Sequence, residues 1–153
     1  MGGHVNDVAH GTIHLDEFLP HAPHKVWRAL TEPELIARWL MPNDFKLEVG
    51  HRFTFRSRPM PDVGFGGICH SEVLAFEVGH MLRIAWRAAP EDRSSLDSVV
   101  TFTLEPEGRG TRLFLTHDGF DPGDPLQALS HRIMGSGWKG IGRRVAAAIE
   151  NAG

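Results

Sequence analysis

The sequence predicts an α+β fold in which a curved antiparallel sheet of about six to seven strands wraps round one long C-terminal helix. Segments that alternate apolar and polar residues fill the middle of the chain, and a helical period of three and four residues runs from residue 125 to the end. Two short helical segments follow the first strand. Because a sheet with one apolar face must be covered, and only the last segment is long enough, that segment is expected to lie across the sheet.

The first predicted strand is Thr12–Leu19, in which Ile13 and Leu15 alternate with polar neighbours. A polar lead over residues 1–11 precedes it and is expected to be flexible. Pro23 then stands where a helix would begin, since proline fits the first helical position. The strand and helix therefore open a single domain expected to span residues 12–150.

A second short helix is predicted around Trp39, ended by Pro42. The sequence Thr31-Glu32-Pro33-Glu34 has the T-x-x-E form of a capping box, so Thr31 is expected to cap the amide of Glu34.

A meander of about six consecutive strands is predicted next, separated by turns rich in Pro and Gly. Strands run from Ile68 to Phe76 and from Thr111 to His117, and three others show clear alternation. Each has one apolar face, which we expect to point toward the final helix. The alternating apolar residues of those three strands are Phe53, Phe55, Leu82, Ile84, Trp86, Val100, Phe102 and Leu104.

The C-terminal helix is predicted to begin with Asp124 as its N-cap and Pro125 at its first position. Four glycines between residues 135 and 142 lower its intrinsic stability by roughly 1 kcal/mol each relative to alanine. They indicate either a close approach of the backbone to the sheet or a local break.

Composition narrows the classes of function. The chain has 153 residues and a net charge of −3, without a Lys/Arg-rich cluster, so nucleic acid is not an expected partner. No run of 18 apolar residues predicts a membrane span, and the N-terminus does not resemble a signal peptide. Cys69 is the single cysteine, which favours a buried thiol and a cytoplasmic protein.

The apolar faces of the sheet and the helix predict a cavity for a hydrophobic small molecule. His117, in phase with Leu113 and Leu115, is the polar residue most suited to orient a ligand there, and His70 and Glu72 are weaker companions. The expected cavity-lining residues are Trp39, Phe53, Phe55, Trp86, Phe102, Leu115, His117, Met134, Trp138 and Ile141.

Motifs for other chemistry are missing from the sequence. The ten histidines show no H-E-x-x-H spacing and there are no paired cysteines, so we expect no metal site. No G-x-S-x-G is present, and Gly64-Phe65-Gly66-Gly67 precedes neither Lys-Ser/Thr nor a helix. We therefore assign no catalytic residue and no cofactor.

Several segments, in this order and spacing, resemble the START and birch-pollen-allergen-like superfamily. They are residues 22–35, Arg38-Trp39-Leu40, 67–76, 100–106, 110–113, 116–120 and Gly137-Trp138. The chain is most similar to the branch named after the activator of Hsp90 ATPase, over roughly residues 12–150. The resemblance implies a helix-grip fold.

This superfamily hosts several functions, so the resemblance leaves three hypotheses open. The first is a module that binds a hydrophobic or amphipathic small molecule. The second is a cyclase- or hydrolase-like enzyme that uses His117 in the same cavity. The third, implied by the family name, is a cochaperone-like or regulatory domain connected with the stress response. An exposed Phe114 could in addition mark a homodimer surface.

Overall fold

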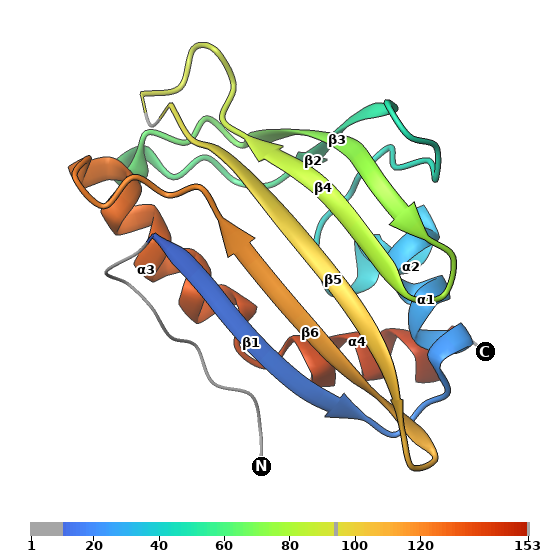
Figure 1. Ribbon diagram of the computed structural model, residues 1–153. Helices are drawn as coiled ribbons and strands as arrows, with labels where there is room; N and C mark the ends of the chain where they lie inside the picture. The colour runs from blue at the N-terminus through green and yellow to red at the C-terminus, as the bar shows by residue number, and fades with distance from the viewer. Residues whose placement is uncertain (1–10, 94, 153) are drawn as a thin grey trace.

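A six-stranded antiparallel sheet curves around two C-terminal helices in the computed structural model, which describes residues 11–93 and 95–152 (Figure 1). The α+β fold with a helix-grip arrangement is confirmed, with six strands at the lower end of the expected number. Apart from Gly11, the predicted lead lies outside the described residues.

The sheet has the strand order β1-β6-β5-β4-β3-β2, with every neighbouring pair antiparallel. A meander runs from β2 to β6, and β1 closes it by pairing with β6. The strands are β1 Thr12–Leu19, β2 Arg52–Arg56, β3 Ile68–Glu77, β4 Met81–Arg87, β5 Asp97–Glu107 and β6 Gly110–Asp118. The helices are α1 Pro23–Thr31, α2 Pro33–Trp39, the 3₁₀ helix η1 Pro61–Val63, α3 Pro125–Trp138 and α4 Ile141–Glu150.

The inner face of the sheet follows the alternation in the sequence. Phe102 of β5 lies opposite Leu82 of β4 and Leu115 of β6, and all three are at most 2% exposed. On the outer face, Arg83 and Arg56, which alternate with the apolar residues of their strands, are exposed. Period-two patterning therefore placed the buried and solvated sides of the strands correctly.

Two short helices occupy the positions expected after β1, but the predicted capping box is wrong. Helix α2 has Glu32 as its N-cap and Pro33 at its first position, with no side-chain hydrogen bond to the cap. Thr31 instead remains the last residue of α1, and its hydroxyl donates to the carbonyl oxygen of Trp27 at 2.8 Å. Proline at the first helical position fixes where the second helix can begin, and this moves the N-cap one residue past Thr31, to Glu32.

The C-terminal helical segment covers the inner face in two parts, α3 and α4. Asp124 caps α3 as predicted, since its carboxylate accepts from the amides of Leu126 and Gln127. The chain breaks at Gly140, whose φ of 78° is in the left-handed region that favours glycine. The two alternatives predicted for the glycines both occur, at different positions, because Gly142 also lies close against Glu17 of β1.

Glu17 holds the junction between the two helices. Its two carboxylate oxygens accept from the backbone amides of Gly140 at 3.0 Å and Gly142 at 2.6 Å. The amides at the start of α4 have no partner within the helix, so the carboxylate accepts their hydrogen bonds. Its negative charge also interacts favourably with the positive end of the helix dipole. The carboxylate thus ties the beginning of α4 to the sheet.

The two helices have different neighbours. Helix α4 packs against α1, α2 and β1, and α3 packs against β1 and the η1 segment. The inner face beside α4 is therefore covered by regular helices. Beside α3 it is covered partly by loops, and this is where the structure leaves space.

Candidate functional site

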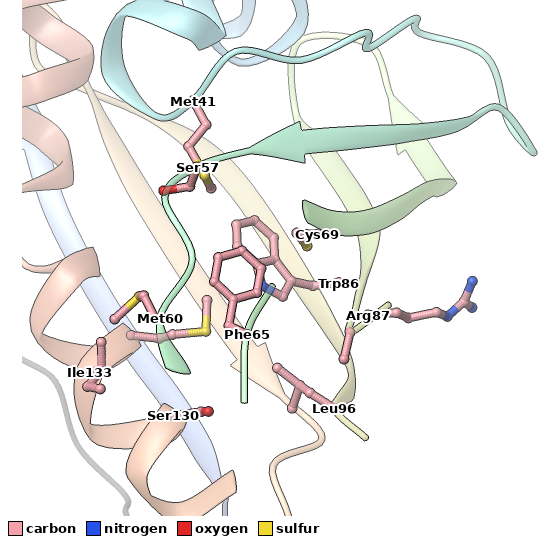
Figure 2. Close-up of a pocket in the computed structure, with 12 residues that line it drawn as sticks. Met41, Ser57, Met60, Phe65, Cys69, Trp86, Arg87, Leu96, Ser130 and Ile133 are labelled. Carbon is pink, nitrogen blue, oxygen red and sulfur yellow. The ribbon is translucent and has the colours of Figure 1, made fainter. Parts of the chain in front are cut away.

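A cavity of about 170 Å³ lies between α3, the η1 segment and the ends of strands β2, β3 and β4 (Figure 2). Most of the side chains around it are apolar, and three of them are methionines. Its lining residues are Met41, Ser57, Met60, Phe65, Cys69, Trp86, Arg87, Ala88, Leu96, Ser130, Ile133 and Met134.

The wall opposite α3 is a short turn held by backbone hydrogen bonds. Met60 and Phe65 pair with each other through amide-to-carbonyl bonds of 2.8 and 3.0 Å, and η1 fills the turn between them. Arg93 donates to the carbonyl oxygen of Pro61 at 2.6 Å and so fastens the turn to the β4–β5 connection. Met60 is 38% exposed, which places it at the mouth of the cavity.

Trp86 forms the floor of the cavity. Its ring packs in edge contacts against Trp138 and His117, each with ring centroids 5.7 Å apart, and the side chain is 6% exposed. Among the described residues, no acceptor forms a hydrogen bond with its indole nitrogen, and that nitrogen is not fully enclosed by protein atoms. Because Trp86 lines the cavity, the remaining access to this N–H is from the cavity.

Neither Arg87 nor Cys69 places a charge inside the cavity, although both belong to its lining. The Arg87 guanidinium points away from it in Figure 2 and pairs with Glu72 at 3.3 Å and Asp97 at 3.2 Å on the outer face. Burial raises the pKa of the Cys69 thiol to about 12, so it stays protonated. In residues 11–93 and 95–152, no three His, Cys, Asp or Glu side chains gather as metal ligands would.

Two of the ten predicted cavity residues, Trp86 and Met134, line this cavity. Seven of the predicted set are joined through ring contacts that connect Trp39, Phe102, Trp138, Trp86, Phe55, Phe53 and His117. The eight that pack in the interior away from the cavity are Trp39, Phe53, Phe55, Phe102, Leu115, His117, Trp138 and Ile141. A ligand-binding role for these eight stays a prediction.

His117 is fully buried, and both of its ring nitrogens have partners. Trp138 is a donor only, so its Nε1 donates to His117 Nδ1, at 3.1 Å. The neutral ring then carries its proton on Nε2 and donates to Ser98 Oγ at 2.8 Å, and Ser98 donates to the carbonyl oxygen of Trp86 at 2.7 Å. Burial, together with nearby His131, lowers the pKa of His117 to about 3.

This geometry gives the enzyme hypothesis no support. A neutral imidazole with both nitrogens bonded, separated from the cavity, has no position from which to exchange a proton with a guest. His70 and Glu72, considered as its companions, lie on the outer face, where His70 is exposed and Glu72 pairs with Arg87. Phe114, the residue suggested for a homodimer surface, is 40% exposed, and the dimer itself stays a prediction.

Sequence reasoning missed the residues that form most of the cavity wall. Met60 and Phe65 belong to a segment rich in Pro and Gly whose sequence predicts a turn, and Leu96 belongs to the β4–β5 connection. Such segments have no hydrophobic period that assigns them to a face. Their unusual content of large apolar residues was the one signal in the sequence that they are partly buried.

Comparisons with known proteins place the chain near one family. Residues 20–150 match the family model described as activator of Hsp90 ATPase homolog 1-like protein. The crystal structure of protein MLL2253 from Mesorhizobium loti is 37% identical, with a TM-score of 0.80, over 93% of this chain and 98% of that one. The solution structure of BH1534 from Bacillus halodurans is 25% identical, with a TM-score of 0.69, over 97% and 99% of the chains.

The fold recurs in more distant structures, such as CV1439 from Chromobacterium violaceum, which is 24% identical with a TM-score of 0.65 over 92% of this chain and 97% of that one. A comparison with curated proteins gave no match. Among the described residues, none of the helices combines the length and apolar character needed to cross a membrane.

Proposed function

The chain belongs to the activator of Hsp90 ATPase homolog 1-like family, and from this premise we propose that it binds a small hydrophobic or amphipathic molecule in the cavity beside α3. The observation that carries the proposal is a cavity of about 170 Å³ with an apolar lining and a mouth at Met60. Protein interiors are close-packed, so an apolar space of this size is unusual where packing alone decides the structure. A concave apolar site with few polar groups is typical of small-molecule binding.

The size of the cavity limits the guest. An engineered apolar cavity of about 150 Å³ holds benzene, so the core of the guest should be one ring or two fused rings. A guest of about ten non-hydrogen atoms that gains roughly 0.5 kcal/mol per atom would bind with about 5 kcal/mol. This corresponds to a Kd of about 0.2 mM.

The lining of the cavity suits flat guests that differ in outline. Trp86 and Phe65 offer aromatic surfaces, and the thioethers of Met41, Met60 and Met134 are flexible and polarizable. Unbranched methionine side chains adjust to guests of different outline at little energetic penalty. The lining therefore favours a class of related compounds over a single rigid ligand.

A thermal-shift screen of neutral aromatic, lipid and polyketide-like compounds tests the proposal when it includes a variant with a filled cavity. Ile133→Trp places a larger side chain into the space from α3, and Phe114→Ser removes a large apolar residue from the outer face as the matched control. A ligand at a hundred times its Kd stabilises by about 2.7 kcal/mol, or roughly 5–10 °C for a chain of this size.

We expect such shifts in the wild type and in the Phe114→Ser variant, and their loss in the Ile133→Trp variant. The proposal fails if no compound raises the Tm of the wild type. It also fails if the shifts persist unchanged when the cavity is filled.

A further inference from the structure

The cavity offers hydrogen-bond donors and no charge, and this limits the chemistry of what it can hold. Resting on the proposed function, we infer that the ligand is a small neutral ring compound with a hydrogen-bond acceptor, such as a ketone oxygen, which accepts from the indole N–H of Trp86. The inference assigns Trp86 as the residue that determines specificity.

The first step is the unpaired donor. Trp86 is 94% enclosed by protein, the complement of its 6% exposure, and among the described residues its N–H has no acceptor. An indole nitrogen donates and never accepts. A guest that covered this N–H without accepting from it would leave a buried donor unsatisfied, which is unfavourable, so the group favours a guest that brings an oxygen or an aromatic nitrogen acceptor into the cavity.

The second step is the contrast with two of the other three indoles, whose nitrogens are bonded; the third, Trp27, also has no acceptor among the described residues but does not line the cavity. Trp39 donates to the carbonyl oxygen of Ala29 at 2.8 Å, and Trp138 donates to His117 at 3.1 Å. Both lie in the packed interior, where the fold itself supplies the acceptor. The fold supplies none to Trp86, although Trp86 packs against Trp138 in the same aromatic cluster.

The remaining polar groups of the lining are hydroxyls. Ser130 of α3 is 7% exposed, and in the part of the chain that the structure describes neither its hydroxyl nor that of Ser57 forms a hydrogen bond with protein. Hydroxyls can donate as well as accept. They are therefore compatible with an acceptor on the guest and add further donors if the guest has a second oxygen.

The third step excludes charged ligands. Arg87 is the one charged lining residue among those described, and its guanidinium is held on the outer face by Glu72 and Asp97 (Figure 2). Asp92, in the loop beside the cavity, accepts from the amides of Gly66 and Ala89. An ion moved into this site would lose its hydration without gaining an opposite charge, which is strongly unfavourable.

A series of ligands on one ring skeleton tests the inference by isothermal titration calorimetry with the wild-type protein. Indane, 1-indanone, the 1-aminoindane cation and the indane-1-carboxylate anion differ in polarity and charge but little in outline. We expect 1-indanone to bind about five to ten times more tightly than indane, as one net hydrogen bond provides. The two ions are expected to bind at least tenfold more weakly than 1-indanone.

Two tryptophan variants then locate the donor. Trp86→Phe keeps an aromatic ring and removes the N–H, whereas Trp27→Phe makes the same change at a residue of similar exposure, 7%, that does not line the cavity. The preference for 1-indanone over indane should fall to less than twofold in Trp86→Phe and stay at the wild-type value in Trp27→Phe. If Trp86→Phe does not fold, the ligand series in the wild type still decides the ligand class, and the indole N–H signal of Trp86 in wild-type NMR spectra locates the donor. That signal should move downfield with 1-indanone and not with indane, and an unchanged signal would overturn the assignment of Trp86.

The outcomes separate this inference from the proposed function. Equal affinity for indane and 1-indanone, tight binding of either ion, or a preference kept by a folded Trp86→Phe variant would overturn the ligand class. In each of these cases the proposed function would still stand if indane binds the wild type and Ile133→Trp abolishes that binding. If neither neutral compound binds the wild type, both the inference and the proposed function fail.

Discussion

The buried His117 gives the protein a pH-dependent stability that a single substitution should remove. Its neutral ring accepts from Trp138 and donates to Ser98, and its pKa is lowered to about 3 from an ordinary 6.5. Because the folded state holds the neutral form, the stabilisation is fully present above about pH 6.5. It is lost as the pH falls toward 3, since the unfolded chain binds the proton more readily.

The magnitude follows from the two pKa values. Between them the free energy of unfolding falls by about 1.4 kcal/mol per pH unit, so that His117 accounts for a loss of about 2–3 kcal/mol between pH 6 and pH 4. In His117→Gln the amide cannot titrate and is expected to keep one of the two hydrogen bonds. The variant should therefore be less stable by about 1–3 kcal/mol at pH 7.

Urea unfolding followed by tryptophan fluorescence at several pH values between 4 and 7 measures both effects. The unfolding free energy of the wild type minus that of His117→Gln should fall by about 2–3 kcal/mol as the pH falls from 6 to 4, to near zero or below it. His24→Gln, on the exposed side of α1, should keep the wild-type pH dependence. Parallel pH curves for the wild type and His117→Gln would refute the reasoning, because they would mean that His117 titrates normally in the folded state.

Three further predictions concern single residues. Glu17→Gln should lower the free energy of unfolding, measured in urea, by about 1–3 kcal/mol, because an amide has one oxygen and keeps only one of the two hydrogen bonds at the start of α4. An unchanged midpoint of urea unfolding would show that the carboxylate does not hold the junction. Asp124→Ala removes the cap of α3 and should lower stability by about 0.5–2 kcal/mol in the same assay, whereas a wild-type value would contradict the capping role. Cys69, 3% exposed and with a raised pKa, should react with a thiol reagent at pH 8 at least a hundredfold more slowly in native protein than in urea, and comparable rates would show that it is accessible.

Local signals in the sequence predicted the elements well. The bounds of β1 and the first residues of α1 and α3 follow from alternation and from prolines at the first helical position. The prediction of a capping box at Thr31 was wrong. It rested on the side chains that could cap a helix and ignored Pro33, which sets the first residue of α2. Glycines in the last segment indicated either a break or a close approach to the sheet, and the structure has one of each.

The candidate site was predictable only in part. Alternation identified which residues point inward, including Trp86 and Phe102, but it does not distinguish an inward residue that is fully packed from one that borders a space. That difference depends on where α3 separates from the sheet and on how the η1 segment closes over it. Both are tertiary arrangements of segments distant in sequence, so Met60 and Phe65 became visible as cavity residues only in three dimensions.

The most direct measurement of the central claim is an NMR experiment that locates a bound guest. Methyl-labelled methionine gives separate signals for Met60 and Met134, which line the cavity from the segment before η1 and from α3. With 1-indanone bound, we expect intermolecular nuclear Overhauser effects from the guest to both methyl groups. A saturating guest that shows contacts only to residues outside the lining, or none to either methionine, would contradict the claim that this cavity is the binding site.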